Sequence, residues 1–341
     1  MRILVAGFGR VGRAFATRLV DGADVLRSAY GIDCEIAGIA TSGGTWMPAA
    51  EADPRDNRSA LAGEPLEQLP GHHEPWDAER AIHELDADLL VEATSGSLET
   101  GEPAITNIRA ALERGMHVVA ASKGAFVRHW AEVRDLAASR GLEVRVGAAA
   151  GAALPTVDVA RYGLAGAEIK AIDGILNGTS NYILSKMASS RATFAEALRD
   201  ARSIGAAEAD PRMDVEGIDT ACKLVIIANA ALGAELLLDD VEVTGITGLD
   251  PADLERSAAR GRTVRLLGTL RRHGGGWRAC VEPTPLRANH PLAAVHGLEK
   301  GICYSTDVMD RVTVIGGRSD PQGAAAALVR DIVNLGRSLA H

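Results

Sequence analysis

Continuous runs of Val, Leu, Ile and Ala recur through the first 147 residues, and helix-length stretches separate them. Strands buried on both faces of a parallel sheet show this pattern, and strands alternating with helices are typical of a doubly wound α/β domain. We therefore predict such a domain over residues 1–147. The expected strands are Arg2–Ala6, Glu35–Ala40, Asp88–Ala93, His117–Ala121 and Glu143–Val146. The expected helices are Val11–Val20, Ala78–Leu85, Pro103–Arg114 and Val127–Arg140.

The pattern changes after Gly147, where an Ala/Gly run before Pro155 is expected to begin a long helix. A mixture of helices and strands follows, which predicts a second, α+β domain with a largely antiparallel sheet over residues 148–316. A closing helix within residues 317–341 is expected to pack back on the first domain. The expected strands are Glu168–Leu176, Val241–Thr244, Thr263–Leu270, Trp277–Val281, Ile302–Ser305 and Arg311–Ile315. The expected helices are Asn181–Ala188, Thr193–Ile204, Val215–Ala231 and Gly323–Arg337.

Composition supports this division and excludes several classes of protein. The 341 residues suit two domains, and 47% apolar residues suit a globular chain. A net charge of −9 argues against general nucleic-acid binding, which needs a basic surface. The four cysteines form no CxxC pair, and no apolar stretch reaches the length of a membrane span. We therefore expect a cytoplasmic protein without nucleic-acid or membrane partners.

A glycine-rich segment lies between the first expected strand and the first helix. Its glycines permit a tight turn and a close approach to a pyrophosphate, and the helix N-terminus supplies free N–H groups. The alternative is a glycine-rich turn without a ligand, but the strand–turn–helix context favours a Rossmann-type dinucleotide site. The predicted cofactor-binding residues of this segment are Gly7, Phe8, Gly9, Arg10, Val11 and Gly12.

The end of the second strand bears on the choice between NAD and NADP. An NAD-selective site usually carries an acid there to hold the ribose 2′-hydroxyl, whereas this strand runs into Thr41-Ser42-Gly-Gly. Arg55 and Arg58 follow and would suit a 2′-phosphate, although solvated loop arginines are the alternative. We therefore expect NADP or NAD, with NADP preferred. Residues 41–76 are rich in Gly, Pro and charge, and we predict that they form mostly loops.

Two further strand ends are expected to lie at the same edge of the sheet, where ligands of open α/β sheets bind. Thr94 and Ser95 follow one strand, and Lys123 follows the next. We predict that all three contact the cofactor and that Lys123 points into the crevice. A surface lysine that caps a loop is the alternative.

Charged side chains interrupt an apolar helix in the second half of the chain. Asp214 suits the N-cap of a helix that begins at Val215, and Glu216, Asp219 and Lys223 follow at positions expected to share one face. Burying such charges costs several kcal/mol unless they are paired. A catalytic site explains the cluster; a structural Asp219–Lys223 pair is the alternative.

The segment Asn177-Gly-Thr-Ser-Asn181 joins an expected strand to a helix. It offers a glycine turn, side-chain donors and a helix N-terminus, which suit a cofactor or substrate, although a well-capped turn is the better explanation for this segment taken by itself. His72-His73-Glu74 has no second ligand pair at a helical or strand spacing, so we predict no metal site.

With these motifs, the sequence resembles the homoserine dehydrogenase family over nearly its whole length. The matching segments are Gly7–Gly12, Ala121–Gly124, Asn177–Leu184, Glu208–Lys223 and His290–Leu292, together with the closing helix. The resemblance implies a Rossmann domain joined to a catalytic and dimerisation domain, in a homodimer or homotetramer. It implies NAD(P)-dependent interconversion of L-homoserine and L-aspartate 4-semialdehyde, a step of threonine and methionine biosynthesis.

The resemblance also implies roles for individual residues. Lys223 would act as general acid/base at the C4 oxygen, and Asp219 would position it. Lys123 would bind substrate or aid proton transfer.

Other residues would hold the ligands. Glu208 and Asp214 would bind the substrate ammonium group. Asn177, Gly178 and Thr179 would lie beside the nicotinamide.

The chain departs from the family pattern in several places. The family usually has Thr-Ala-Asn-Lys where Ala120–Lys123 stands. Gly147–Pro155 replaces Glu-Ala-x-Val-Gly-Gly-Gly-Ile-Pro, so the glutamate that helps some members to bind a monovalent cation is absent. Gly316–Gly323 replaces a loop of glycines and small residues. We expect no regulatory ACT domain of the kind that longer members carry, and therefore no threonine feedback through such a domain.

The departures over Gly147–Pro155 motivate one rival, a related dehydrogenase that acts on another amino alcohol or amino-acid semialdehyde. A rival of another class is a non-catalytic dinucleotide sensor that uses the same cleft to bind a partner. Lys123, Asp219 and Lys223 argue against the sensor.

Overall fold

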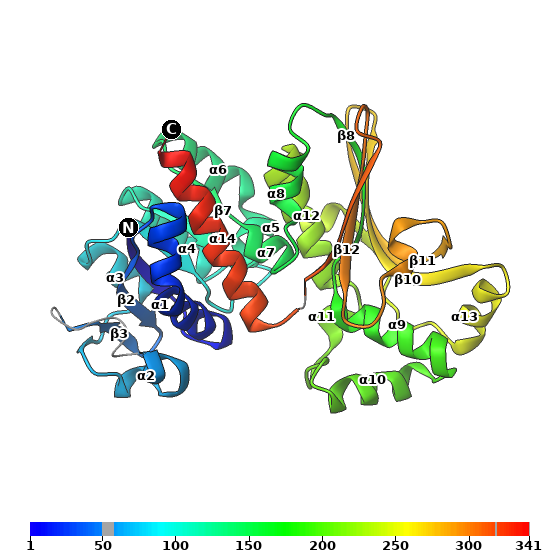
Figure 1. Cartoon of the computed structure of the whole chain (residues 1–341), viewed down its shortest axis with the longest axis horizontal. Coiled ribbons are helices and arrows are strands. Elements are labelled where there is room, and N and C mark those ends of the chain that lie inside the picture. Colours follow the sequence, from blue (N-terminus) through cyan, green and yellow to red (C-terminus); the bar gives the residue numbers. More distant parts are fainter. Residues whose placement is uncertain (50–57, 318, 341) are drawn as a thin grey trace. The chain divides into compact units, whose positions relative to one another are not determined.

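The computed structural model describes residues 1–49, 58–317 and 319–340, which form two compact units (Figure 1). Unit 1 consists of Met1–Ala152 and Asp320–His341, and unit 2 of Ala153–Ser319. Unit 1 is therefore discontinuous along the chain. Among the described residues, no helix combines the length and the apolar character that crossing a membrane requires.

A seven-stranded sheet forms the centre of unit 1 within the described residues. The strands from β2 to β7 in the spatial order run parallel, and β3 and β4 extend the β2 edge antiparallel. The sequence order reverses between β1 and β5, which makes this the switch point of a doubly wound sheet. In spatial order the strands are β4 (His72–Glu74), β3 (Gly44–Met47), β2 (Glu35–Thr41), β1 (Arg2–Ala6), β5 (Leu89–Glu92), β6 (His117–Ala120) and β7 (Val144–Arg145).

Amphipathic helices cover this sheet. Helix α1 runs to Tyr30, beyond the predicted end at Val20, and stops where Gly31 adopts a left-handed φ of 68°. Phe15 and Leu19 of α1 share an apolar core with Leu328 of α14, and Figure 1 shows these two helices side by side. The helices are α1 (Arg10–Tyr30), α2 (Arg58–Gly63), α3 (Ala78–Glu84), α4 (Ala104–Glu113), α5 (Gly124–Arg128), α6 (Trp130–Ser139), α7 (Gly147–Gly151) and α14 (Pro321–Leu339).

The prediction of loops over residues 41–76 is wrong for much of this stretch. The described part contains β3, α2, a 3₁₀ turn η2 (Leu66–Gln68) and β4. Trp46 on β3 is nearly inaccessible and donates its indole N–H to the carbonyl oxygen of Pro70. A buried aromatic of this kind anchors strands that are too short to show a period-two pattern.

The predicted long helix after Gly147 is also wrong. Helix α7 ends at Gly151 because Ala152 turns to a positive φ of 49°, which an L side chain adopts reluctantly. Pro155 then precedes two short turns in unit 2, α8 (Thr156–Asp158) and η3 (Val159–Gly163).

Gly147 itself lies under a carboxylate from α14. Asp331 is 2% exposed, and a Cβ atom at Gly147 would lie 2.5 Å from its Oδ1 and 3.0 Å from a guanidinium nitrogen of Arg330. The backbone N–H of Ala148 donates to Asp331 Oδ2 over 3.3 Å. The space beside residue 147 is therefore filled by an acidic side chain from another element.

Gly147→Glu should lower the free energy of unfolding by about 3 kcal/mol, because the new carboxylate is overpacked against a buried like charge. Urea titration of both proteins measures the change. The double variant Gly147→Glu/Asp331→Gly removes both the clash and the second charge, and it should recover most of the loss. Equal stability of Gly147→Glu and the original chain would contradict this account.

Unit 2 is built on a sheet of six strands within its described residues. All neighbours are antiparallel except β11 and β9. Two glycines with positive φ, Gly274 and Gly275, make the tight turn of the β10–β11 hairpin. In spatial order the strands are β13 (Arg311–Gly316), β12 (Lys300–Thr306), β8 (Ile169–Ile175), β10 (Arg262–His273), β11 (Gly276–Arg287) and β9 (Val241–Val243).

Helices pack on this second sheet. Helix α12 is the most apolar, and its Thr220 approaches β10 so closely that a Cβ atom at Gly268 would lie 3.1 Å from the threonine methyl carbon. This close contact restricts how α12 packs on the sheet. The longer helices are α9 (Gly178–Ser190), α10 (Phe194–Ser203), α12 (Ile218–Leu232) and α13 (Pro251–Ala258), and a short α11 (Arg212–Val215) precedes α12.

Candidate active site

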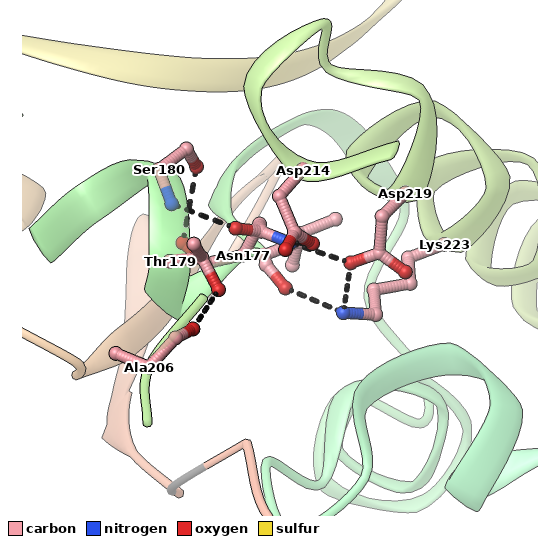
Figure 2. Close-up of polar contacts among 8 residues, drawn as sticks. Asn177, Thr179, Ser180, Ala206, Asp214, Asp219 and Lys223 are labelled. Carbon is pink, nitrogen blue, oxygen red and sulfur yellow. Dashed lines mark hydrogen bonds and ion pairs between the residues drawn. The ribbon is translucent and has the colours of Figure 1, made fainter. Parts of the chain in front are cut away.

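A buried ion pair on α12 forms the centre of the candidate site (Figure 2). Lys223 and Asp219 are each only 8% exposed, and Lys223 Nζ lies 2.5 Å from Asp219 Oδ2. Lys223 Nζ also donates to the carbonyl oxygen of Leu176 at the end of β8, over 2.9 Å. An ammonium group has three N–H donors, so these two partners among the described residues leave one donor for a ligand.

The amide of Asn177 organises the carboxylates around this pair. Its Nδ2 donates to Asp214 Oδ1 over 2.6 Å and to Asp219 Oδ2 over 2.9 Å. Its Oδ1 accepts the backbone N–H of Ser180 and so caps α9. One buried side chain therefore links the first turn of α9 to both acids, as Figure 2 shows.

The charges of this cluster do not cancel. The pKa of Asp214 is raised, first by burial and then by the neighbouring carboxylate of Asp219, and hydrogen bonding to Asn177 and the positive charge of Lys223 offset this only in part. Two carboxylates face one ammonium group, so the fully ionised cluster carries one excess negative charge. A cationic group of a ligand would relieve this imbalance.

Two expectations about the start of α12 are wrong. Asp214 is not the N-cap of a helix at Val215 but lies inside α11, and α12 begins at Ile218 after Gly217. Gly217 has a φ of 86°, which breaks the helix between these segments. Glu216 consequently lies outside α12 and is exposed, so it does not share the face of Asp219 and Lys223.

The remaining predicted residues of unit 2 lie around the start of α9. Thr179 donates its hydroxyl to the carbonyl oxygen of Ala206 over 2.7 Å, which ties the segment after α10 to α9. Glu208 lies on that segment and is exposed. A Cβ atom at Gly178 would lie 2.8 Å from the carbonyl oxygen of Leu298, so only glycine fits there. Cofactor contact by Asn177, Gly178 and Thr179 stays a prediction.

The glycine segment of unit 1 has the geometry of a dinucleotide cradle. A Cβ atom at Gly12 would lie 2.0 Å from the carbonyl oxygen of Gly7, and one at Gly7 would lie 2.7 Å from the carbonyl carbon of Ala93. At Gly9, in contrast, no atom lies within 4 Å of such a position. Gly9 is the N-cap of α1, so no side chain of the cap residue occupies the helix N-terminus, and the first turn carries no acidic residue. An anion therefore fits at this helix end.

The turn after β2 has an acidic neighbour that sequence reasoning missed. Glu67 comes from η2, and its Oε1 lies 3.6 Å from the position of a Cβ atom at Gly43. Thr41 holds the turn by donating its hydroxyl to the carbonyl oxygen of Gly44 over 3.1 Å. Residues 50–57, including Arg55, lie outside the described residues, and the side chain of Arg58 is likewise not described.

The other strand ends of unit 1 lie at the expected edge. Thr94 and Ser95 follow β5, and the backbone nitrogen of Thr94 lies directly beside Gly7. Lys123 precedes α5 at its N-cap position and is half-buried. The structure therefore gathers the predicted residues of unit 1 at the carboxyl ends of β1, β5 and β6.

Family models cover both units of this architecture. Residues 7–147 match the model described as the homoserine dehydrogenase NAD binding domain. Residues 155–333 match the homoserine dehydrogenase model, which spans the Lys223 cluster. The chain belongs to the homoserine dehydrogenase family. The predicted family and the predicted fold class, a Rossmann-type domain followed by a second domain with α-helices and β-strands, are confirmed.

Individual relatives agree with this membership. A homoserine dehydrogenase of Methanocaldococcus jannaschii is 35% identical over 339 residues, which is 98% of each chain. An NAD(+)-dependent homoserine dehydrogenase of Pseudomonas canavaninivorans is 34% identical over 99% of this chain and 96% of its own length. The crystal structure of a putative homoserine dehydrogenase from Archaeoglobus fulgidus superposes with a TM-score of 0.87 at 32% identity, over 98% of each chain.

Membership of the homoserine dehydrogenase family confirms the predicted class of enzyme. The chain is an oxidoreductase that acts on a CH–OH group with a nicotinamide cofactor. The family models do not assign roles to single residues, so these roles follow from geometry and chemistry.

Proposed function

We propose that this chain oxidises L-homoserine to L-aspartate 4-semialdehyde, and catalyses the reverse reduction, with Lys223 as the proton carrier. The observation that carries this proposal is the buried Lys223–Asp219 pair, whose ammonium group keeps one N–H donor for a ligand. A homodimer or homotetramer and a cytoplasmic role in threonine and methionine biosynthesis are part of the same proposal.

Oxidation of the alcohol removes a hydride from C4 and a proton from the oxygen on C4. The bound nicotinamide cofactor supplies the hydride acceptor. The neutral amine of Lys223 takes the proton from the hydroxyl group, and its ammonium form returns a proton to the carbonyl oxygen in the reverse direction. Asp219 and the carbonyl oxygen of Leu176 fix the nitrogen in place, so Asp219 is a positioning residue.

The carboxylates of unit 2 suit the rest of an amino-acid substrate. Asp214 holds the excess negative charge beside Lys223, and we propose that it binds the substrate ammonium group together with Glu208. Glu208 lies on the segment that Thr179 ties to α9. Lys123 in unit 1 would bind the substrate or aid the proton transfer.

The direct test measures reduction of NAD and of NADP with L-homoserine, through the near-ultraviolet absorbance of the reduced cofactor. Related hydroxy amino acids, such as L-serine (one carbon shorter) and L-threonine (an isomer), form the substrate panel. Turnover of L-homoserine well above all others is expected. Faster turnover of another amino alcohol would replace the proposed substrate, and binding of cofactor without any turnover would favour a sensor.

We further propose that both cofactors are accepted, with NADP preferred, because Thr41 and Ser42 bring no carboxylate to the end of β2. Glu67 opposes the 2′-phosphate from the side, and Glu67→Gln should therefore raise kcat/KM for NADP relative to NAD by about threefold, a typical size for an exposed charge. The exposed Glu64→Gln, before η2, is the matched control. An unchanged ratio would show that Glu67 does not face the 2′ position.

A further inference from the structure

A fully buried carboxyl group lies at the end of β5, at the switch point of the unit 1 sheet. Glu92 is 0% exposed. Its Oε1 accepts the backbone N–H of Thr94 over 2.8 Å and also accepts the Thr94 hydroxyl. Its Oε2 accepts from Asn107 Nδ2 on α4 over 2.9 Å. Each carboxyl oxygen therefore accepts a hydrogen bond, and two of the three hydrogen bonds come from Thr94.

The segment that Glu92 holds is confined on both sides by glycines. A Cβ atom at Gly7 would lie 2.8 Å from the backbone nitrogen of Thr94, and one at Gly124 would lie 2.4 Å from the carbonyl oxygen of Ser97. The glycine cradle thus packs on the start of segment 93–97, and the residue after Lys123 packs on its end. Glu92 supports this segment from within the sheet.

These bonds determine what Thr94 can offer to a ligand. Its N–H and its hydroxyl hydrogen are both directed at Glu92. A threonine hydroxyl has one hydrogen and two lone pairs, so Thr94 Oγ1 is left as an acceptor only. Thr94 is half-buried beside Gly7 and reaches the edge where a dinucleotide lies in this fold.

Burying a carboxyl group costs free energy, which a purely structural role at this position would not require. Burial raises the pKa of Glu92, and the hydrogen bonds from Thr94 and Asn107 only oppose this shift. An apolar side chain of similar volume would fill the same space without that cost. What such a side chain cannot do is direct the Thr94 hydroxyl hydrogen away from the ligand.

We propose that Glu92 is a positioning residue of the dinucleotide site, which orients Thr94 so that its hydroxyl oxygen accepts a hydrogen bond from an O–H or N–H donor of the cofactor. The inference rests on the proposed use of NAD(P). It assigns no contact between Glu92 and the cofactor itself.

Fluorescence titration with NADH and NADPH, without substrate, measures the effect. Glu92→Leu keeps the side-chain volume and removes both acceptors, and it should weaken cofactor binding about tenfold, the size of one hydrogen bond. Thr94→Val should weaken binding by the same factor, and the double variant should be no weaker than either single variant. Glu92→Gln should bind within about twofold of the original chain, because its amide oxygen still accepts from Thr94.

The controls separate positioning from loss of structure. The exposed Glu102→Gln on the following loop should leave binding unchanged, and thermal unfolding of every variant checks its fold. In turnover the KM for the cofactor should rise in Glu92→Leu while kcat at saturating cofactor stays near its original value. If Glu92→Leu does not fold, Thr94→Val still tests the proposal, because unchanged cofactor binding in that variant overturns it.

Several outcomes would overturn the proposal. Unchanged binding in Thr94→Val or in a folded Glu92→Leu would do so, as would independent, multiplying losses in the double variant. Because binding is measured without an amino alcohol, failure to oxidise L-homoserine would refute the proposed substrate and leave this test intact.

Discussion

We expect Lys223→Ala to lower kcat for oxidation of L-homoserine by about three orders of magnitude and to leave cofactor binding unchanged. General acid/base catalysis by one positioned group contributes roughly 10²–10⁴-fold to a rate. Lys223 Nζ is the amine that lies 2.5 Å from Asp219 Oδ2, and an alanine at this position provides no group that can carry the proton. Steady-state rates with saturating cofactor measure the effect.

The alanine variant also removes the ammonium group beside the buried Asp219 and the half-buried Asp214, which destabilises the fold. Lys223→Met/Asp219→Asn removes the proton carrier and one acid together, keeps both side-chain volumes, and should unfold near the temperature of the original chain. It should be as slow as the alanine variant. A rate within tenfold of the original in either variant would eliminate Lys223 as the proton carrier.

Gly12→Ala is expected to abolish measurable cofactor binding and to lower the free energy of unfolding by about 3 kcal/mol or more. The new Cβ atom would lie 2.0 Å from the carbonyl oxygen of Gly7. The oxygen is a backbone atom, and the Cβ atom is bonded directly to the backbone of the same turn. No flexible side chain can therefore move aside, and the turn itself must open. Urea titration and fluorescence titration with NADH measure the two effects.

Two other glycines of the same region provide matched controls. Gly22 lies within α1 and has no atom within 4 Å of a new Cβ, so Gly22→Ala should stabilise the helix by about 1 kcal/mol. Gly9 is equally open, and Gly9→Ala should fold normally but bind cofactor more weakly, because the cradle loses its close approach to the pyrophosphate. Equal unfolding curves for Gly12→Ala and Gly9→Ala would contradict the steric argument.

Much of the fold follows from local patterns in the sequence. The strands β1, β2, β5 and β6 lie within one or two residues of their predicted bounds, because buried parallel strands are continuous apolar runs. The stretch over residues 41–76 could not be predicted in this way. Its strands β3 and β4 are short, and tertiary contacts such as the buried Trp46 stabilise them.

The candidate site likewise has a part that local sequence patterns predict and a part that depends on tertiary contacts. The pairing of Asp219 with Lys223 follows from helical spacing, and the structure contains it. The left-handed turn at Gly217 does not follow from helical spacing. Because of this turn, Asp214 lies in α11 and Glu216 is exposed to solvent. The carbonyl oxygen of Leu176 carries no sequence signal at all. Glu67 and Glu92 were missed because their significance lies in which distant backbone or hydroxyl group they approach.

The discontinuity of unit 1 has a consequence for how the protein is made. A ribosome delivers residues 1–152 first, then the whole of unit 2, and only afterwards α14, whose Leu328 and Ile332 complete the core around Phe15 and Leu19. Throughout that interval the nascent Rossmann sheet has one uncovered apolar flank. Vectorial synthesis therefore gives unit 2 the chance to fold before unit 1 is complete, and the apolar side chains that α14 covers stay exposed until this last helix has been made.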